Sequence, residues 1–147
     1  MTAGSRDWRA CIRSGAKAAS DTIMRCTILV VDDEAPIRDL LSDFFVKKGY
    51  SVLTGSSVEE ALRKANEESL HLVIMDVLLP DGDGMEALSA IKSAHPQLPV
   101  LIMTGIGFDE ELLQEAKQRG ASGYVSKTLP LNQLLMEVHR ILRPGKS

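Results

Sequence analysis

Short apolar runs alternate with amphipathic segments from residue 26 almost to the end of the chain. Five runs carry no charged residue, and they lie at residues 27–31, 50–54, 72–75, 100–103 and 122–126. Runs of this length and composition are typical of strands that are buried on both faces of a parallel sheet. We therefore predict five strands.

A helical pattern follows each of these runs. After the first run, apolar side chains recur at helical spacing at Ile37, Leu40, Leu41, Phe44 and Phe45. Pro36 suits the first turn of this helix and Gly49 its end. Similar patterns predict helices that begin after Ser57, after Gly84, at about Asp109 and at about Leu131. Strands and helices that alternate in this way predict a doubly wound α/β fold, with a five-stranded parallel sheet flanked by five helices.

Two local motifs refine this outline. Ser57 and Glu60 have the spacing of a capping box at the start of the second helix. Residues 78–84, rich in Gly, Asp and Pro, predict a loop of turns before the third helix. The last helix is expected to stop at Pro144-Gly145.

Composition excludes several classes of protein. The chain has 147 residues, of which 44% are hydrophobic and 25% charged, which suits one globular domain. A net charge of −3 does not provide the basic surface of a general nucleic-acid-binding protein. No apolar run approaches the roughly 18 residues of a membrane helix, so we expect no membrane insertion. Cys11 and Cys26 form neither a disulfide framework nor a zinc motif, which favours a cytoplasmic location.

Residues 1–23 differ from the rest because Gly and Ser interrupt every regular pattern. We expect a flexible N-terminal extension here and a folded domain over residues 24–147. Two other interpretations are a membrane or partner anchor and a linker cut from a larger protein. Met24 stands just before the first predicted strand, so it is also a candidate start of translation.

Charged side chains follow three of the predicted strands directly. Asp32 and Asp33 follow the first strand, Asp76 the third, and Lys127 the last. The carboxyl ends of parallel strands meet at one edge of a sheet, so these side chains are expected to lie together. Three carboxylates in one place repel each other unless a cation binds between them. Mg²⁺ suits such a site because it needs few protein ligands, and the sequence predicts a metal-assisted phosphoryl site.

Four segments resemble, in the same order, those of the receiver domain of two-component response regulators. They are Val30-Val31-Asp32-Asp33-Glu34, residues 75–84, Ile102-Met103-Thr104-Gly105 and residues 121–127. The resemblance extends from Cys26 to about Arg143 and implies a flavodoxin-like sheet with strand order 2-1-3-4-5. It also implies a signalling protein rather than an enzyme, which assists its own Mg²⁺-dependent phosphorylation and dephosphorylation.

The resemblance assigns a role to each matching residue. Asp76 is expected to be the phospho-acceptor, with Lys127 and Thr104 contacting the phosphoryl group. Thr104 and Tyr124 are expected to be the switch residues. The expected Mg²⁺ ligands are Asp32, Asp33, Asp76 and the backbone carbonyl of Leu78.

Partners follow from the same resemblance. A histidine kinase or a histidine phosphotransfer protein is expected to supply the phosphoryl group, with Ile37, Arg38 and Leu41 on the first helix as the docking face. The fourth helix, the last strand and the last helix are expected to change on phosphorylation and to bind an unknown protein target. With no output domain after Ser147, a single-domain regulator or a phosphorelay protein is expected, without direct nucleic-acid binding. A receiver cut from a hybrid kinase and a scaffold that is not phosphorylated remain alternatives.

Two rival functions fit the sequence less well. A phosphatase of the haloacid dehalogenase type requires an Asp-x-Asp motif after the first strand, and adjacent Asp32 and Asp33 have the wrong spacing. A dinucleotide-binding domain requires a glycine-rich loop at the same place, where this chain has Glu34-Ala35-Pro36.

The chain departs from the family pattern at two places. Thr128 follows Lys127 where the family usually has a proline after a cis bond, and a Lys–Thr bond costs about 2.5–4 kcal/mol to be cis. This cost favours a trans bond and leaves the direction of Lys127 open. Leu78 and Ile106 are both apolar beside the expected phosphate, which predicts slow hydrolysis of the phosphorylated form.

Overall fold

The computed structural model describes residues 26–105 and 109–142. Its main sheet has five parallel strands in the order β2-β1-β3-β6-β7. They are β1 (Thr27–Val31), β2 (Ser51–Gly55), β3 (Leu72–Asp76), β6 (Val100–Thr104) and β7 (Gly123–Ser126). The predicted fold class and strand order are therefore confirmed, with β6 and β7 as the fourth and fifth strands. The extension expected over residues 1–23, Ile106 and the predicted stop at Pro144-Gly145 lie outside the described residues.

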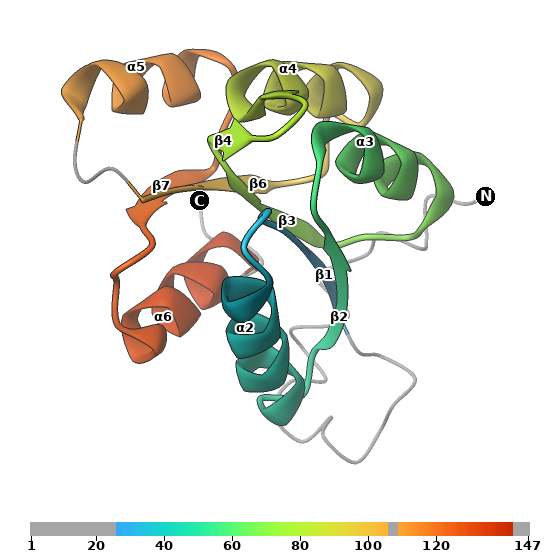
Figure 1. Cartoon of the computed structure of the whole chain (residues 1–147), viewed down its shortest axis with the longest axis vertical. Helices are drawn as coiled ribbons and strands as arrows, with labels where there is room; N and C mark the ends of the chain where they lie inside the picture. The colour runs from blue at the N-terminus through green and yellow to red at the C-terminus, as the bar shows by residue number, and fades with distance from the viewer. Residues whose placement is uncertain (1–25, 106–108, 143–147) are drawn as a thin grey trace.

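Five helices in the described residues cover the two faces of this sheet. They are α2 (Ala35–Lys47), α3 (Val58–Glu67), α4 (Gly84–Ala94), α5 (Glu110–Gln118) and α6 (Leu131–Leu142). Helices α2 and α6 lie on one face, and α3, α4 and α5 lie on the other (Figure 1). None of the helices in residues 26–105 and 109–142 is long and apolar enough to cross a membrane.

Each face of the sheet has its own apolar core. Phe45 of α2 is fully buried on one face, together with Ile28 and Ile74 of the strands. On the other face, Leu88 of α4 packs with Val73 of β3 in the second core. The strands β3 and β6 are buried along their whole length, as expected for strands covered on both sides.

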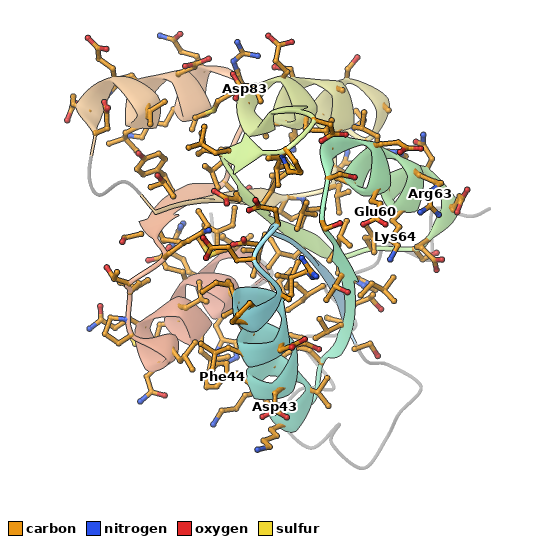
Figure 2. All side chains as sticks on the ribbon, viewed as in Figure 1. Asp43, Phe44, Glu60, Arg63, Lys64 and Asp83 are labelled. Carbon is orange, nitrogen blue, oxygen red and sulfur yellow. The ribbon has the colours of Figure 1, made fainter. Side chains whose placement is uncertain are left out.

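Helix ends follow the predicted signals with one local difference. Gly49 and Gly120 end α2 and α5 with positive φ angles of 100°, a conformation that favours glycine. Ser57 accepts a hydrogen bond from the backbone N–H of Glu60 at 3.1 Å, as predicted. However, the Glu60 carboxylate accepts from the backbone N–H of Ser56 at 2.7 Å, so the reciprocal half of the capping box binds one residue earlier. Glu60, Arg63 and Lys64 are marked on α3 in Figure 2.

The segment predicted as a loop of turns contains a short antiparallel hairpin. Strand β4 (Leu78–Leu79) pairs with β5 (Gly82–Asp83), which leads directly into α4. At the tip of the hairpin, the Asp81 carboxylate accepts hydrogen bonds from the backbone N–H groups of Val58 at 2.7 Å and Glu59 at 3.1 Å. Asp81 thus caps α3 from a distant part of the chain.

Gly84 holds the start of α4 against the end of β3. Its backbone N–H donates to the carbonyl of Val77 at 2.6 Å. A Cβ atom at this position would lie 2.2 Å from the carbonyl oxygen of Asp76, so a larger residue cannot be accommodated without moving the backbone. The glycine is therefore required by the close approach of two backbone segments at the end of β3.

Candidate functional site

Four polar side chains meet at the carboxyl edge of the sheet. Asp32 directly follows β1, Asp76 and Thr104 are the last residues of β3 and β6, and Lys127 directly follows β7. The parallel register brings these strand ends together, since Thr104 lies beside Ser126 across the β6–β7 pair. Only 0%, 4% and 2% of the surfaces of Asp32, Asp76 and Thr104 are exposed, respectively. Of the side chains predicted at this edge, Asp32, Asp76 and Lys127 therefore lie together and are largely buried, whereas Asp33 is exposed.

Lys127 lies at the centre of the cluster. Its Nζ atom is 2.9 Å from Oδ2 of Asp76 and 2.9 Å from Oδ2 of Asp32, and it donates a hydrogen bond to Oδ1 of Asp32 at 3.2 Å. The Glu34 carboxylate lies 3.7 Å from the same nitrogen. The side chain of Lys127 is only 12% exposed, so water screens these ion pairs weakly.

The carboxylates outnumber the ammonium group that they share. Asp32, Asp33 and Asp76 each present an oxygen atom within 4.8 Å of the other two. Asp32 and Asp76 are buried, whereas Asp33 is exposed, so the cluster opens toward solvent on one side. Negative charge in excess of one ammonium, presented by oxygen atoms with an open side, fits a hard divalent cation such as Mg²⁺.

Burial and charge shift the acid–base properties of the two central groups. Burial raises the pKa of Asp76 above its usual value, and the negative charge of Asp32 adds to this effect, while the hydrogen bond from Lys127 opposes it. Burial alone would lower the pKa of Lys127, but hydrogen bonds and attraction to Asp76 and Asp32 together raise it. Lys127 therefore remains protonated at neutral pH and partly compensates the buried carboxylates.

Two residues near Asp32 hold it in place, and sequence reasoning gave neither this role. The Arg38 guanidinium donates to the backbone carbonyl of Asp32 at 2.6 Å. Oδ1 of Asp32 accepts from the backbone N–H of Glu34 at 2.9 Å. Glu34 is the N-cap residue of α2, but its side chain makes no capping hydrogen bond. In the sequence, the only indication that Glu34 would also lie near Lys127 is that this acidic residue directly follows Asp32 and Asp33.

The loops around the cluster are tied to one another by backbone hydrogen bonds. The N–H of Lys127 donates to the carbonyl of Thr104 at 2.7 Å. The N–H of Leu78 donates to Oδ1 of Asp76 at 3.3 Å, and the Leu78 side chain is 62% exposed. Every peptide bond in the described residues is trans, including the bond between Lys127 and Thr128. Lys127 nevertheless reaches Asp76 directly, which settles its direction.

Tyr124 lies on β7 on the side of the sheet covered by α5. Its side chain packs against the core of that face, as does Leu112 of α5. Its hydroxyl oxygen is buried and has no hydrogen-bond partner of normal geometry among residues 26–105 and 109–142. Burial raises the pKa of Tyr124, and the negative charge of Asp109 adds to the rise. In this structure the hydroxyl of the predicted switch residue therefore already occupies a buried position.

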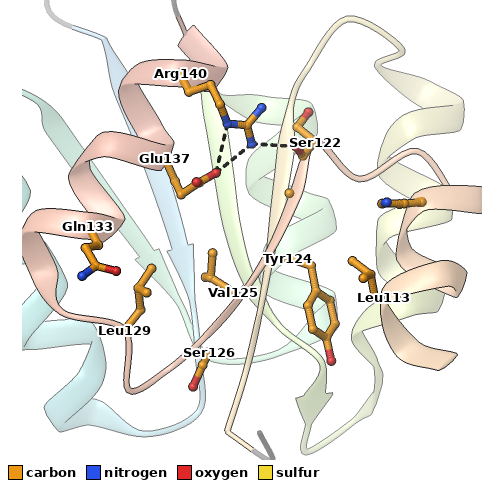
Figure 3. Close-up of a pocket in the computed structure, with 11 residues that line it drawn as sticks. Leu113, Ser122, Tyr124, Val125, Ser126, Leu129, Gln133, Glu137 and Arg140 are labelled. Carbon is orange, nitrogen blue, oxygen red and sulfur yellow. Dashed lines mark hydrogen bonds and ion pairs between the residues drawn. The ribbon is translucent and has the colours of Figure 1, made fainter. Parts of the chain in front are cut away.

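A surface groove follows β7 between α5 and α6. It has a volume of about 530 Å³, and Figure 3 shows Tyr124 and Leu113 on one side of it and Glu137 and Arg140 on the other. The Arg140 guanidinium donates to the Glu137 carboxylate at 2.7 and 3.1 Å and to the carbonyl of Ser122 at 3.3 Å. These elements are the fourth helix, last strand and last helix predicted from sequence as the readout surface.

Comparison with known families identifies the domain. The model of the response regulator receiver domain matches residues 28–139, which include all the cluster residues and all of the strands and helices except Thr27 and the last three residues of α6. The chain belongs to the response regulator receiver domain family. Receiver domains are signalling domains of two-component phosphorelay systems, and they receive phosphoryl groups from histidine kinases or phosphotransfer proteins.

Relatives of this receiver domain differ in how much of their length it covers. Sporulation initiation phosphotransferase F of Bacillus subtilis is 34% identical over 125 residues, which are 85% of this chain and 99% of that protein. Alkaline phosphatase synthesis transcriptional regulatory protein PhoP of the same organism is 38% identical over 122 residues, which are 82% of this chain. The chain spans about half of the length of PhoP, with 50% of that protein covered.

Solved structures agree with the fold of this receiver domain. Chemotaxis protein CheY4 of Vibrio cholerae superposes with a TM-score of 0.74 at 31% identity, covering 80% of this chain and 98% of that one. A two-component response regulator from Clostridium difficile gives a TM-score of 0.77 at 29% identity, covering 84% of this chain and all of that one. Receiver domains bind Mg²⁺ at an acidic pocket, and the cluster of Asp32, Asp33 and Asp76 has the composition of such a pocket.

Proposed function

We propose that this receiver domain is a single-domain response regulator that accepts a phosphoryl group on Asp76. A histidine kinase or a histidine phosphotransfer protein donates the group in a Mg²⁺-dependent reaction. The observation that carries the proposal is the position of the Asp76 carboxylate, which lies 2.9 Å from Lys127 and beside two further carboxylates at one edge of the sheet. Similarity over 99% of the length of Sporulation initiation phosphotransferase F shows that a relative of this size consists of the receiver domain alone.

Asp76 acts as the nucleophile in this reaction. A carboxylate oxygen attacks the phosphorus atom of the donor, a new O–P bond forms, and the bond from phosphorus to the donor nitrogen breaks. Burial raises the pKa of Asp76, and the hydrogen bond from Lys127 opposes this rise. The ion pair with Lys127 also holds the Asp76 carboxylate in one orientation. Asp32, Asp33, Asp76 and the backbone carbonyl of Leu78 would hold Mg²⁺. When bound, this ion neutralises charge on the phosphoryl oxygens.

Phosphorylation then changes the balance of charge around Lys127 and Thr104. The phosphoryl group adds about −1.5 to −2 charge at neutral pH, and both residues can donate hydrogen bonds to it. Changing the ratio of two loop arrangements from 1:99 to 99:1 needs about 5.5 kcal/mol. Two charge-assisted hydrogen bonds of about 1.5–3 kcal/mol each supply most of this free energy. Because the N–H of Lys127 already binds the Thr104 carbonyl, a movement of Thr104 is transmitted to the end of β7.

The effect of phosphorylation would be transmitted to a partner through the protein surface beside Tyr124. Tyr124 packs beside α5 and lines the groove between α5 and α6. A change in the position of Thr104 alters the space available to the Tyr124 hydroxyl, whose electrostatic environment includes Thr104. We propose that this α5–β7–α6 surface binds the downstream protein or a phosphotransfer partner.

Intact-mass spectrometry tests the acceptor role. The protein is incubated with acetyl phosphate, with and without Mg²⁺, beside Asp76→Asn and the control Asp43→Asn, whose carboxylate is an exposed partner of Lys47. We expect a gain of one phosphoryl group that requires Mg²⁺, persists in Asp43→Asn and disappears in Asp76→Asn. No gain under any condition would instead favour a scaffold that is not phosphorylated.

A further inference from the structure

Lys127 is followed by a tight turn in which two hydroxyl side chains take part. The Ser126 hydroxyl oxygen accepts a hydrogen bond from the backbone N–H of Thr128 at 3.0 Å. The hydroxyl groups of Ser126 and Thr128 lie 2.8 Å apart. The turn closes with a hydrogen bond from the N–H of Leu129 to the carbonyl of Ser126 at 3.0 Å. Hydrogen bonds among Ser126, Thr128 and Leu129 therefore close the turn that contains Lys127.

The other side of Lys127 is fixed as well. Its own N–H donates to the carbonyl of Thr104 at 2.7 Å, so the backbone is held both before and after the side chain. A lysine side chain is flexible and can adopt many rotamers, so the direction of its Cα–Cβ bond decides which groups its ammonium reaches. The two sets of bonds set that direction, and Nζ reaches Asp76 and Asp32 at 2.9 Å from it.

The chemistry of residue 128 is what permits this arrangement. A proline has no backbone N–H and could not donate to the Ser126 hydroxyl. The Ser126 acceptor is useful only when residue 128 keeps its N–H and the preceding peptide bond is trans, as both are here. Thr128 is exposed and Ser126 is half-buried, so neither residue contributes to the apolar cores.

We propose that Ser126 and the N–H of Thr128 form a positioning pair that directs Lys127 toward Asp76. The pair does by a side chain-to-backbone hydrogen bond what the rigid proline ring does where a proline follows the lysine. Ser126 and Thr128 do not touch the reacting atoms themselves. This inference rests on the proposed function, because the purpose of the pair is to hold Lys127 for phosphoryl transfer.

Two measurements on the full chain that need no phosphoryl donor test the pair directly. Hydrogen exchange followed by NMR reports on the Thr128 amide, and ¹³C relaxation of the Lys127 Cε methylene reports on side-chain order. We expect Ser126→Ala to speed exchange at Thr128 by about 2- to 10-fold, the range for loss of one hydrogen bond, and to increase the motion of Lys127. Ser126→Thr keeps the hydroxyl acceptor and should restore both values.

The rate of phosphorylation by acetyl phosphate at saturating Mg²⁺ provides the third measurement. We expect Ser126→Ala to lower this rate by about 2- to 10-fold with little change in the melting temperature. The control Ser122→Ala, which lies just before the opposite end of β7, should leave the rate unchanged. Thr128→Val keeps the N–H and should retain most of the rate. In a Thr128→Pro background the donor is already absent, so Ser126→Ala should have no further effect.

The outcomes separate this inference from the proposed function. Failure of the unsubstituted protein to accept a phosphoryl group would overturn the proposed function, and exchange and relaxation would still decide whether the pair orders Lys127. Normal phosphorylation of the unsubstituted protein, with an equal rate and equal Lys127 order in Ser126→Ala, would overturn the inference alone. An equal loss in Ser126→Ala and Ser126→Thr would also overturn it, because the conservative replacement retains the acceptor.

Discussion

The interior of the sheet and the two buried carboxylates at its carboxyl edge are both removed from water, but with opposite energetic consequences. In the interior, side chains such as Ile74 and Ile102 are fully buried and wholly apolar, so removing them from water stabilises the fold. At the edge, Asp32 and Asp76 are nearly as buried, yet their charges lose hydration and repel each other. Within the described residues, Lys127 is the one cationic side chain that forms an ion pair with them, and the backbone N–H groups of Glu34 and Leu78 add one hydrogen bond each. The comparison teaches that burial provides stability in one region and concentrates negative charge in the other.

This difference predicts that substitutions in the two regions separate stability from phosphoryl chemistry. Changes in the interior should lower the free energy of unfolding and leave the acceptor reaction intact in the folded molecules. Changes at the edge should alter the reaction and should affect stability in a direction that depends on Mg²⁺.

The largest effect on stability is expected from Phe45→Ala in the interior. The Phe45 side chain is fully buried, and truncation of such a side chain costs about 3–5 kcal/mol of unfolding free energy. Urea denaturation measures the loss. Phe44→Ala is the matched control, because Phe44 is only half-buried and should cost clearly less. Equal losses for the two variants would contradict the assignment of Phe45 to the core.

Lys127→Met should have the next largest effect, because it leaves two buried carboxylates without their ammonium partner. Removing one member of a buried ion pair costs up to about 3–5 kcal/mol, and the open side of the cluster places this change toward the lower end. Mg²⁺ should recover much of the loss, so its addition should raise the melting temperature more than in the unsubstituted protein.

Lys47→Met is the control for this comparison. Lys47 pairs with Asp43 at 3.3 Å on an exposed helix surface, where such pairs contribute about 0–1 kcal/mol. If Lys127→Met loses no more stability than Lys47→Met and responds to Mg²⁺ in the same way, repulsion between the buried carboxylates at the edge of the sheet does not destabilise the fold.

Asp76→Asn should increase stability in the absence of Mg²⁺. Burial raises the pKa of Asp76 in the folded state, so this residue favours folding below its unfolded-state pKa, and that advantage is lost as the pH rises through the folded value. Asparagine resembles the protonated carboxyl at every pH, so its stabilising effect should grow as the pH rises from 3 to 7. Melting temperatures across this range, with EDTA present, measure it. A variant that is less stable than the unsubstituted protein at pH 7 would contradict the prediction.

Asp81→Ala should have the smallest effect, because Asp81 caps α3 from the exposed tip of the hairpin. The hydrogen bond from the N–H of Val58 lowers the pKa of Asp81, and the bond from Glu59 adds to the shift. The stabilisation is therefore present above the usual pKa of 3.8 and is lost as the pH falls through the lower folded value. We expect a modest fall in melting temperature at pH 7 that shrinks toward pH 3. The control Asp43→Ala removes an exposed carboxylate that makes no such cap, and should differ little from the unsubstituted protein at pH 7.

Most of the secondary structure could be predicted from local patterns, and the boundaries show where prediction ends. The strand predicted at residues 100–103 extends to Thr104, because Thr104 pairs with Ser126 of the neighbouring strand. The strand predicted at residues 72–75 likewise extends to Asp76, which pairs with Met103. Whether a polar residue at the end of an apolar run belongs to the strand depends on its pairing with the adjacent strand, and the local sequence does not show this pairing.

The sequence by itself determined the alternation of strands and helices, and it indicated that Asp32, Asp76 and Lys127 would share one edge, because parallel strands end on the same side. Only the tertiary structure decided that Lys127 contacts Asp32 across 95 residues of chain, and that Asp81 caps a helix 23 residues before it. Local patterns record the hydrophobic period of each element. Contacts between distant segments depend on register and on close approach, which are settled only when both faces of the sheet are packed.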